Sequence, residues 1–85
     1  MASYRLLIKP SAVKELESLP HKDRRRVIHR VQALAEEPRP AGAEKLKGIE
    51  LYRVRQGDYR VLYEVADAAE TVTVIKIGNR RDVYR

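Results

Sequence analysis

The second half of the chain follows a two-residue hydrophobic alternation, and this pattern restricts the fold more than any other feature. In residues 51–55 and 59–65, tyrosines and valines alternate with residues that are mostly charged. Residues 71–77 are rich in β-branched residues. Short segments separate these stretches, and Gly57 supplies the positive φ that a tight turn needs. We therefore expect three consecutive strands joined by hairpins.

The alternation also assigns the side chains of these strands to two faces of a sheet, because successive residues of a strand point to opposite sides. One face is expected to form the core; it carries Tyr52, Val54, Tyr59, Val61, Tyr63 and Val65. The other face carries Arg53, Arg55 and Arg60. The sheet is thus expected to have one apolar face and one cationic face.

The first half of the chain has the period of amphipathic helices. Residues 3–9 are expected to form a strand that ends at Pro10. A short helix then runs towards Pro20, and a second helix covers residues 21–36 with an apolar stripe on one side. Because almost no residues connect the two helices, we expect them to form an antiparallel hairpin.

These elements predict an α+β fold in the order β-α-α-β-β-β, in which a twisted antiparallel sheet packs against the helical hairpin. The chain has 85 residues, which suits one domain spanning residues 1–85. Its apolar stretches are only a few residues long, far below the ~18 needed to span a bilayer. Cysteine is absent and no signal-peptide pattern opens the chain, so we expect a cytoplasmic location.

The charge balance points to an anionic partner. Lys and Arg total 18 against 12 Asp and Glu, which gives a net charge of +6. Most of these cations are arginines, whose planar guanidinium pairs bidentately with phosphate. The balance alone is compatible with a nucleic acid and with an acidic protein.

Several kinds of site are excluded by the residues present. The chain contains no P-loop, no GxGxxG and no HExxH motif. Its two histidines, His21 and His29, lie on the outward side of the second predicted helix and lack further ligands at suitable spacing. We therefore expect them to be solvated, and we expect no metal and no cofactor.

The cations of the second half are expected to converge, because residues two apart on a strand share a face and hairpin partners are neighbours. Arg53 and Arg55 lie on the first strand of the meander, Arg60 opens the next, and Arg80 follows the last. Like charges placed together on a sheet reduce stability. The pattern therefore favours a site that receives an anion, although pairing with nearby acids would also explain it.

The blocks Gly57-Asp58-Tyr59-Arg60-Val61-Leu62-Tyr63 and Arg80-Arg81-Asp82-Val83-Tyr84-Arg85, with the opening Ile8-Lys9-Pro10-Ser11-Ala12, carry a family resemblance. Together they resemble the RelE/ParE toxin superfamily of bacterial type II toxin–antitoxin modules, over nearly the whole chain. The resemblance is strongest to the RelE branch. Members of that branch are ribosome-dependent mRNA endoribonucleases.

The resemblance implies that the RNA 2′-hydroxyl attacks the adjacent phosphorus, which requires no metal and leaves a 2′,3′-cyclic phosphate. It implies that Arg60 and Arg80 hold the scissile phosphate, and that Arg53 and Arg55 add positive charge. Tyr84 would stack on a base, orient the 2′-hydroxyl or transfer a proton. Further RNA contacts are expected from Lys45, Lys47, Arg81 and Arg85.

The proton-transfer groups stay open. RelE-branch members carry lysines where this chain has Arg53 and Arg55, and arginine is a poor general acid or base. Many relatives carry histidine where Asn79 lies. Proton transfer would then fall to Tyr84, to Lys45 or Lys47, or to groups of the ribosome.

The resemblance also implies the partners: mRNA in the ribosomal A site, the ribosome itself, and an acidic antitoxin that covers the cationic surface. Arg24, Arg25, Arg26 and Arg30 on the second helix are interpreted as a solvated face or an antitoxin contact. Two alternatives remain. One is a ParE-like inhibitor of DNA gyrase, and the other is a catalytically weak member that acts mainly as the antitoxin's partner.

Overall fold

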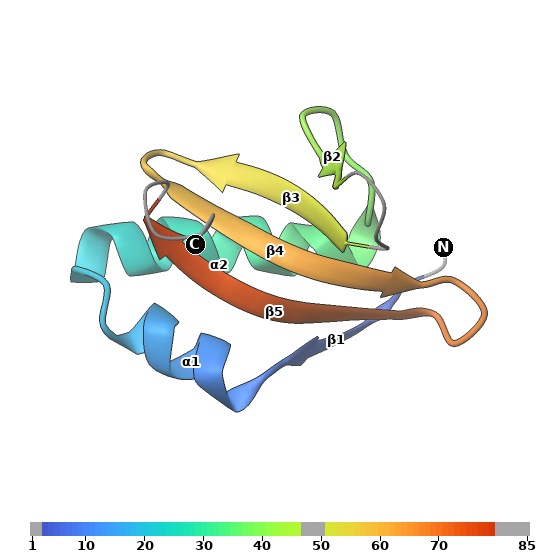
Figure 1. The fold of residues 1–85 in the computed structure, drawn as a ribbon, viewed down its shortest axis with the longest axis horizontal. Helices are drawn as coiled ribbons and strands as arrows, with labels where there is room; N and C mark the ends of the chain where they lie inside the picture. Colours follow the sequence, from blue (N-terminus) through green and yellow to red (C-terminus); the bar gives the residue numbers. More distant parts are fainter. Residues whose placement is uncertain (1–2, 47–50, 80–85) are drawn as a thin grey trace.

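The computed structural model describes residues 3–46 and 51–79 and contains two helices and five strands (Figure 1). In chain order these are β1 (Arg5–Ile8), α1 (Pro10–Glu17), α2 (His21–Glu36), β2 (Glu44–Lys45), β3 (Leu51–Gln56), β4 (Tyr59–Ala66) and β5 (Thr71–Asn79). The α+β class and the order of the expected elements are confirmed. The two-residue strand β2 was not expected.

The strands form one sheet in the order β1-β5-β4-β3-β2. The meander β3-β4-β5 is antiparallel, as the hairpins predicted, and Gly57 has a φ of 62° in the first turn. β1, however, pairs with β5 in parallel, so the sheet is mixed rather than antiparallel throughout. The reason is topological: the α1–α2 hairpin carries the chain across the sheet between β1 and the meander.

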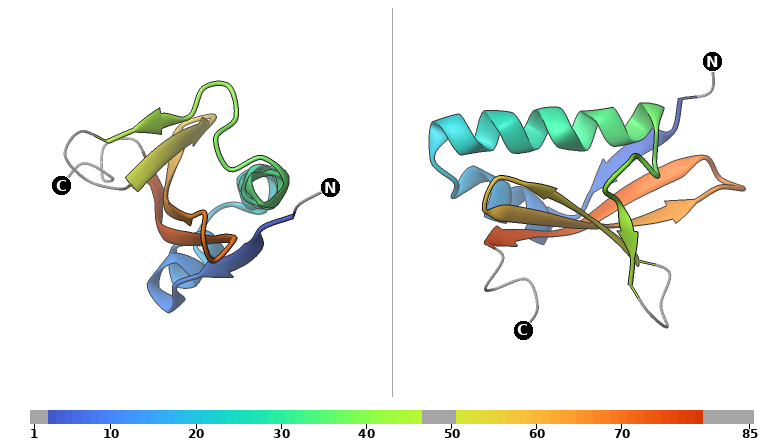
Figure 2. Two further views of the ribbon diagram at one scale, coloured as in Figure 1. Left: turned by 90° about the vertical axis from the view of Figure 1, so that its right-hand side faces the viewer. Right: turned by 90° about the horizontal axis from the view of Figure 1, so that it is seen from above.

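The helices cover one face of the sheet, and the core lies between the two layers (Figure 2). α1 and α2 run in roughly opposite directions, as expected from the short connection (Figure 1). The fully buried side chains come from both helices and from β3, β4 and β5; they include Ala12 of α1, Val27 and Leu34 of α2, and Val61 and Tyr63 of β4. The Tyr63 hydroxyl donates a 2.6 Å hydrogen bond to the Pro38 carbonyl, and burial raises the pKa of Tyr63 to about 12.

A register shift in β5 keeps its apolar residues in the core. Val72 and Val74 point inward, and strict alternation would bring Lys76 inward next. The pairing with β4 shifts between Leu62 and Tyr63, so that Ile77 lies in the core and Lys76 lies across from Leu62. The bulge therefore resolves a conflict between alternation and hydrophobicity.

Glu15 of α1 completes the edge of β5 beyond the point where β1 ends. Pairing with β1 stops at Val74, which leaves the next backbone groups of β5 without a strand partner on that side. The Glu15 carboxylate accepts a 2.9 Å hydrogen bond from the Ile77 amide and lies 3.3 Å from the Lys76 ammonium. One side chain thus protects the exposed part of the edge.

A polar cluster on the surface fastens the loop between α2 and β2. Arg39 donates two hydrogen bonds to Asp67, at 3.1 and 2.8 Å, and one to the Tyr52 hydroxyl at 3.0 Å. The Tyr4 hydroxyl donates to the same carboxylate at 2.7 Å. These contacts join the loop to β3, to the β4–β5 turn and, through Asp67, to Tyr4 just before β1. They therefore fix the segment that leads into β2.

Candidate functional site

The face of the sheet that turns away from the helices, here called the outer face, carries two rows of side chains across the strands. The pairing registers define the first row as Glu44, Arg53, Leu62 and Lys76, on β2, β3, β4 and β5. The second row consists of Arg55, Arg60 and Gly78. Alternation with the buried Val54, Val61 and Tyr63 places the arginines on this face, as the sequence predicted.

Arg55 and Arg60 are direct cross-strand neighbours on β3 and β4. Arg60 is only 8% exposed, whereas Arg55 is exposed. The sequence predicted a cation on the surface at position 60, and the burial is a departure from that expectation. Gly78 pairs with Arg60 from β5. Because glycine has no side chain, no side chain of β5 at this position competes with Arg60 for space on the outer face.

Arg53 forms an ion pair with Glu44 across the β2–β3 pairing. The hydrogen bond from Arg53 lowers the pKa of Glu44 below its usual range, and the charges of Arg55 and Arg60 lower it further. One carboxylate therefore feels all three arginines, which indicates that their charges converge. Sequence reasoning missed Glu44 because β2 is too short to show a pattern.

The remaining predicted residues divide into two groups. Lys45 pairs with Tyr52, so alternation puts it on the face opposite to Glu44 and away from the arginine rows. Five predicted residues lie outside the described part of the chain: Lys47, Arg80, Arg81, Tyr84 and Arg85. The structure thus brings together Arg53, Arg55 and Arg60, and leaves the roles assigned to the others as predictions.

No group of three or more His, Asp or Glu residues suitable for a metal occurs within residues 3–46 and 51–79. His21 and His29 are exposed on α2, in agreement with the sequence. In the same residues, no helix is both long and apolar enough to cross a membrane.

Comparison with known proteins gives the class of protein that this fold and site define. Residues 6–84 match the family described as the ParE toxin of the type II toxin–antitoxin system, parDE. The chain is 32% identical over 84 residues to the toxin RelE of Mycobacterium tuberculosis, covering 96% of this chain and 87% of the relative.

Solved structures agree with this match. A chain of the archaeal RelE–RelB complex from Pyrococcus horikoshii has a TM-score of 0.83 and 36% identity, with 94% of this chain and 98% of that chain covered. The isolated RelE toxin of E. coli has a TM-score of 0.80 and 30% identity, with coverage of 96% and 92%. The protein belongs to the RelE/ParE toxin superfamily, and it is a type II toxin of the RelE family.

Proposed function

We propose that this chain is a ribosome-dependent endoribonuclease that cuts mRNA in the ribosomal A site and thereby inhibits translation. The observation that carries the proposal is the convergence of Arg53, Arg55 and Arg60 on one face of the sheet. Two arginines paired across neighbouring strands repel each other, and an anion bound beside them relieves that repulsion. A phosphodiester supplies that anion.

The chemistry is attack of the RNA 2′-oxygen on the adjacent phosphorus, with loss of the 5′-oxygen and formation of a 2′,3′-cyclic phosphate. Negative charge builds on the phosphorus oxygens in the transition state. Arg60 is held by its surroundings and Arg55 lies beside it, so their charge is arranged before the substrate arrives. Arg80 joins Arg60 at the scissile phosphate, and Tyr84 stacks on a base or assists proton transfer.

Glu44 acts as an internal counter-anion rather than as the general base. Its pKa is lowered by Arg53 first and then by the two other arginines, so it is ionised but a weak acceptor of protons. In the RNA-free toxin it neutralises part of the cationic face. The incoming phosphate competes with it for Arg53. Proton transfer is left to Tyr84, Lys47 or groups of the ribosome, because Lys45 lies on the opposite face of the sheet.

The antitoxin is the second partner. Solved relatives include toxins in complex with the RelB antitoxin. In this chain an acidic antitoxin segment would be drawn to the same arginines that take the phosphate, and its binding would exclude RNA. Masking of the outer face is therefore the proposed mode of inhibition.

A second candidate is inhibition of DNA gyrase, because the matching family is described as the ParE toxin. The two functions share a fold and differ in their target. Gyrase inhibition would not depend on the arginine pair of the outer face as a phosphate site.

The decisive experiment compares Arg60→Gln and Arg60→Lys with the wild-type chain on programmed ribosomes, with cut mRNA mapped by primer extension. Arg60→Gln is expected to lower the cleavage rate about 100-fold or more, the usual effect of removing one preorganised group that stabilises transition-state charge. Arg60→Lys keeps the charge but loses the planar fork, so it should retain an intermediate rate. Arg5→Gln is the matched control, since Arg5 is an exposed arginine opposite Thr71 on β1.

Circular dichroism checks that each variant folds, which matters because Arg60 is largely buried. Cleavage by folded Arg60→Gln at the wild-type rate would refute the phosphate-binding role. Absence of cleavage by the wild type, together with gyrase-dependent DNA breakage, would replace the proposal by the gyrase alternative.

A further inference from the structure

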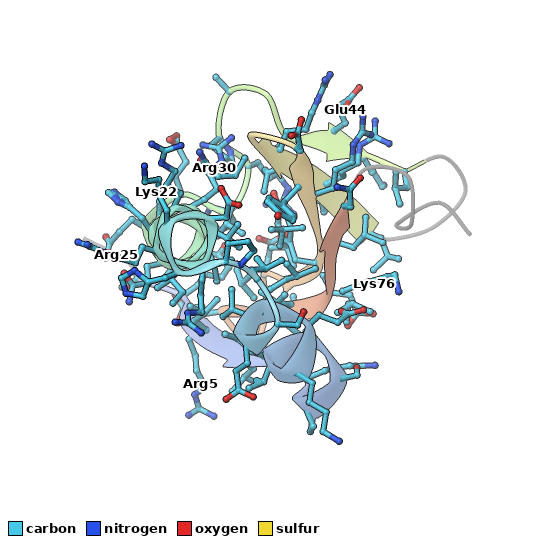
Figure 3. All side chains as sticks on the ribbon, turned by 90° about the vertical axis from the view of Figure 1, so that its left-hand side faces the viewer. Arg5, Lys22, Arg25, Arg30, Glu44 and Lys76 are labelled. Atoms are coloured by element: carbon cyan, nitrogen blue, oxygen red, sulfur yellow. The ribbon has the colours of Figure 1, made fainter. Side chains whose placement is uncertain are left out.

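The solvent-exposed side of α2, which borders the end of β3 at Gln56, carries a second set of cations. Lys22, Arg25, Arg26, His29 and Arg30 occupy positions i, i+3, i+4, i+7 and i+8, the spacing with which a helix normally presents an apolar stripe. With Gln56 they line an open groove of about 740 Å³. Figure 3 shows α2 with Lys22, Arg25 and Arg30 on one side of the molecule, and Glu44 and Lys76 on the other.

These cations are not used by the fold. Within the described residues, Lys22, Arg25, Arg26 and Arg30 form no ion pair. The acids of the helix are engaged elsewhere: Asp23 accepts a 3.3 Å hydrogen bond from the Tyr59 hydroxyl, and Glu36 accepts one from Ser3.

Mutual repulsion follows from the spacing, because cations three and four residues apart on a helix are neighbours and destabilise it. Lys22 and Arg26 form one such pair, and Arg26 and Arg30 another. In addition, the Arg30 Nε is buried and has no hydrogen-bond partner within residues 3–46 and 51–79. A stripe of this kind lowers the stability of the free toxin and is relieved by an anion.

The composition of the groove distinguishes between two anionic partners. A helix or strand of another protein docks through apolar anchors, and the centre of a protein interface is poor in charge. Among the described residues that line this groove, Ala33 alone is apolar. Nucleic-acid interfaces are by contrast polar and strongly positive, so the groove fits a phosphate backbone better than a peptide.

We infer that the α2 groove is a docking surface for the phosphate backbone of duplex RNA, separate from the outer face. From Lys22 to Arg30 the helix rises about 12 Å, which corresponds to roughly three or four nucleotide steps along one strand. Contacts of this kind position a protein without reading sequence. The two cationic faces lie on opposite sides of the sheet, so the toxin would hold structured RNA on α2 and single-stranded RNA on the outer face (Figure 3).

The test uses the full chain and a fluorescein-labelled RNA hairpin with a 20-base-pair stem, with binding followed by fluorescence anisotropy between 50 and 200 mM KCl. One triple variant removes charge from the groove: Lys22→Gln, Arg25→Gln, Arg26→Gln. A matched triple removes the same charge from exposed positions on β1, the β1–α1 junction and α1: Arg5→Gln, Lys9→Gln, Lys14→Gln.

Each phosphate contact contributes about 0.9 to the slope of log affinity against log salt. If all three residues touch phosphates, the groove variant loses about 2.7 of that slope. Over the fourfold change in salt the wild type then loses about 40-fold more affinity than the groove variant does. The control triple is expected to keep the wild-type slope.

An equal effect of both triple variants on the salt slope would overturn the inference, because it would show that net charge, and not the position of the groove, determines RNA binding. So would an unchanged RNA slope combined with weakened antitoxin binding, which would assign the groove to the protein partner. The hairpin assay does not require cleavage. If the chain turns out not to cleave RNA, the docking inference can still hold. If the groove variant binds the hairpin with the wild-type slope while Arg60→Gln is inactive in cleavage, the docking inference alone is refuted.

Discussion

Replacing Arg55 by glutamine is expected to make the toxin more stable and less active. Arg55 lies directly opposite Arg60 in the β3–β4 pairing, on the face that the helices leave uncovered. Directly opposed like charges destabilise a sheet. Glutamine is shorter than arginine but keeps a polar side chain, and it removes the repulsion. The substrate loses one of the cations that would hold its phosphate.

The size of the gain follows from the geometry. Cross-strand partners have Cβ atoms about 5 Å apart, and two unit charges about 6 Å apart in water repel by about 0.7 kcal/mol. Measured cross-strand charge effects are about 0.2–1 kcal/mol, in agreement with this figure. For a domain of this size, such a gain raises the melting temperature by about 1–8 °C.

The assay is thermal unfolding of wild type and Arg55→Gln at 20 mM and at 1 M NaCl, followed by circular dichroism. Salt screens charges over about 3 Å at 1 M, so the difference in melting temperature should shrink at high salt. Arg5→Gln, on β1 opposite Thr71, should leave the melting temperature nearly unchanged. A lower melting temperature for Arg55→Gln, or a gain that salt does not reduce, would refute the view that the arginine pair is strained by repulsion.

Three further outcomes follow from the structure. Glu44→Gln removes the carboxylate that neutralises the arginines, so affinity for a single-stranded oligonucleotide should rise in a low-salt binding titration; an unchanged or lower affinity would contradict its role as counter-anion. Leu34→Ala empties a fully buried position and should cost about 2–5 kcal/mol in urea unfolding, and a cost below 1 kcal/mol would mean that α2 packs less tightly than described. Hydrogen bonds from Arg39 and, to a smaller extent, from Tyr4 lower the pKa of Asp67. The ionised Asp67 carboxylate therefore stabilises the fold fully above pH ~4, and this stabilisation is lost as the pH falls through the lowered pKa. Melting curves of Asp67→Asn should therefore converge with those of the wild type in acid, and parallel curves would count against the network.

The local elements could be predicted because each has its own signal in the sequence. Residues 21–36 carry a continuous helical period, and the observed α2 has those bounds. Gly57 marks the first hairpin and adopts the positive φ that its turn requires. Such signals depend only on residues close in the chain, so they can be recognised without knowledge of the tertiary structure.

The long-range pairings could not be predicted in the same way. β1 has four residues, and nothing within them specifies a parallel partner more than sixty residues later. The bulge near Leu62 and Tyr63 depends on competition between alternation and the demand for Ile77 in the core. The burial of Arg60 likewise depends on what neighbouring strands present, since alternation alone assigns it to the surface.

The electrostatics of the outer face depend on the loop that brings β2 to the sheet. Glu44 meets Arg53 only because the chain leaving α2 returns along β3, and that path is held by the contacts of Arg39 with Asp67 and Tyr52. The cluster lies away from the arginine rows, yet it determines whether their counter-anion is in place. Loosening it would release Glu44 from Arg53 and increase the unbalanced positive charge that an RNA phosphate, or the acidic segment of an antitoxin, encounters on binding.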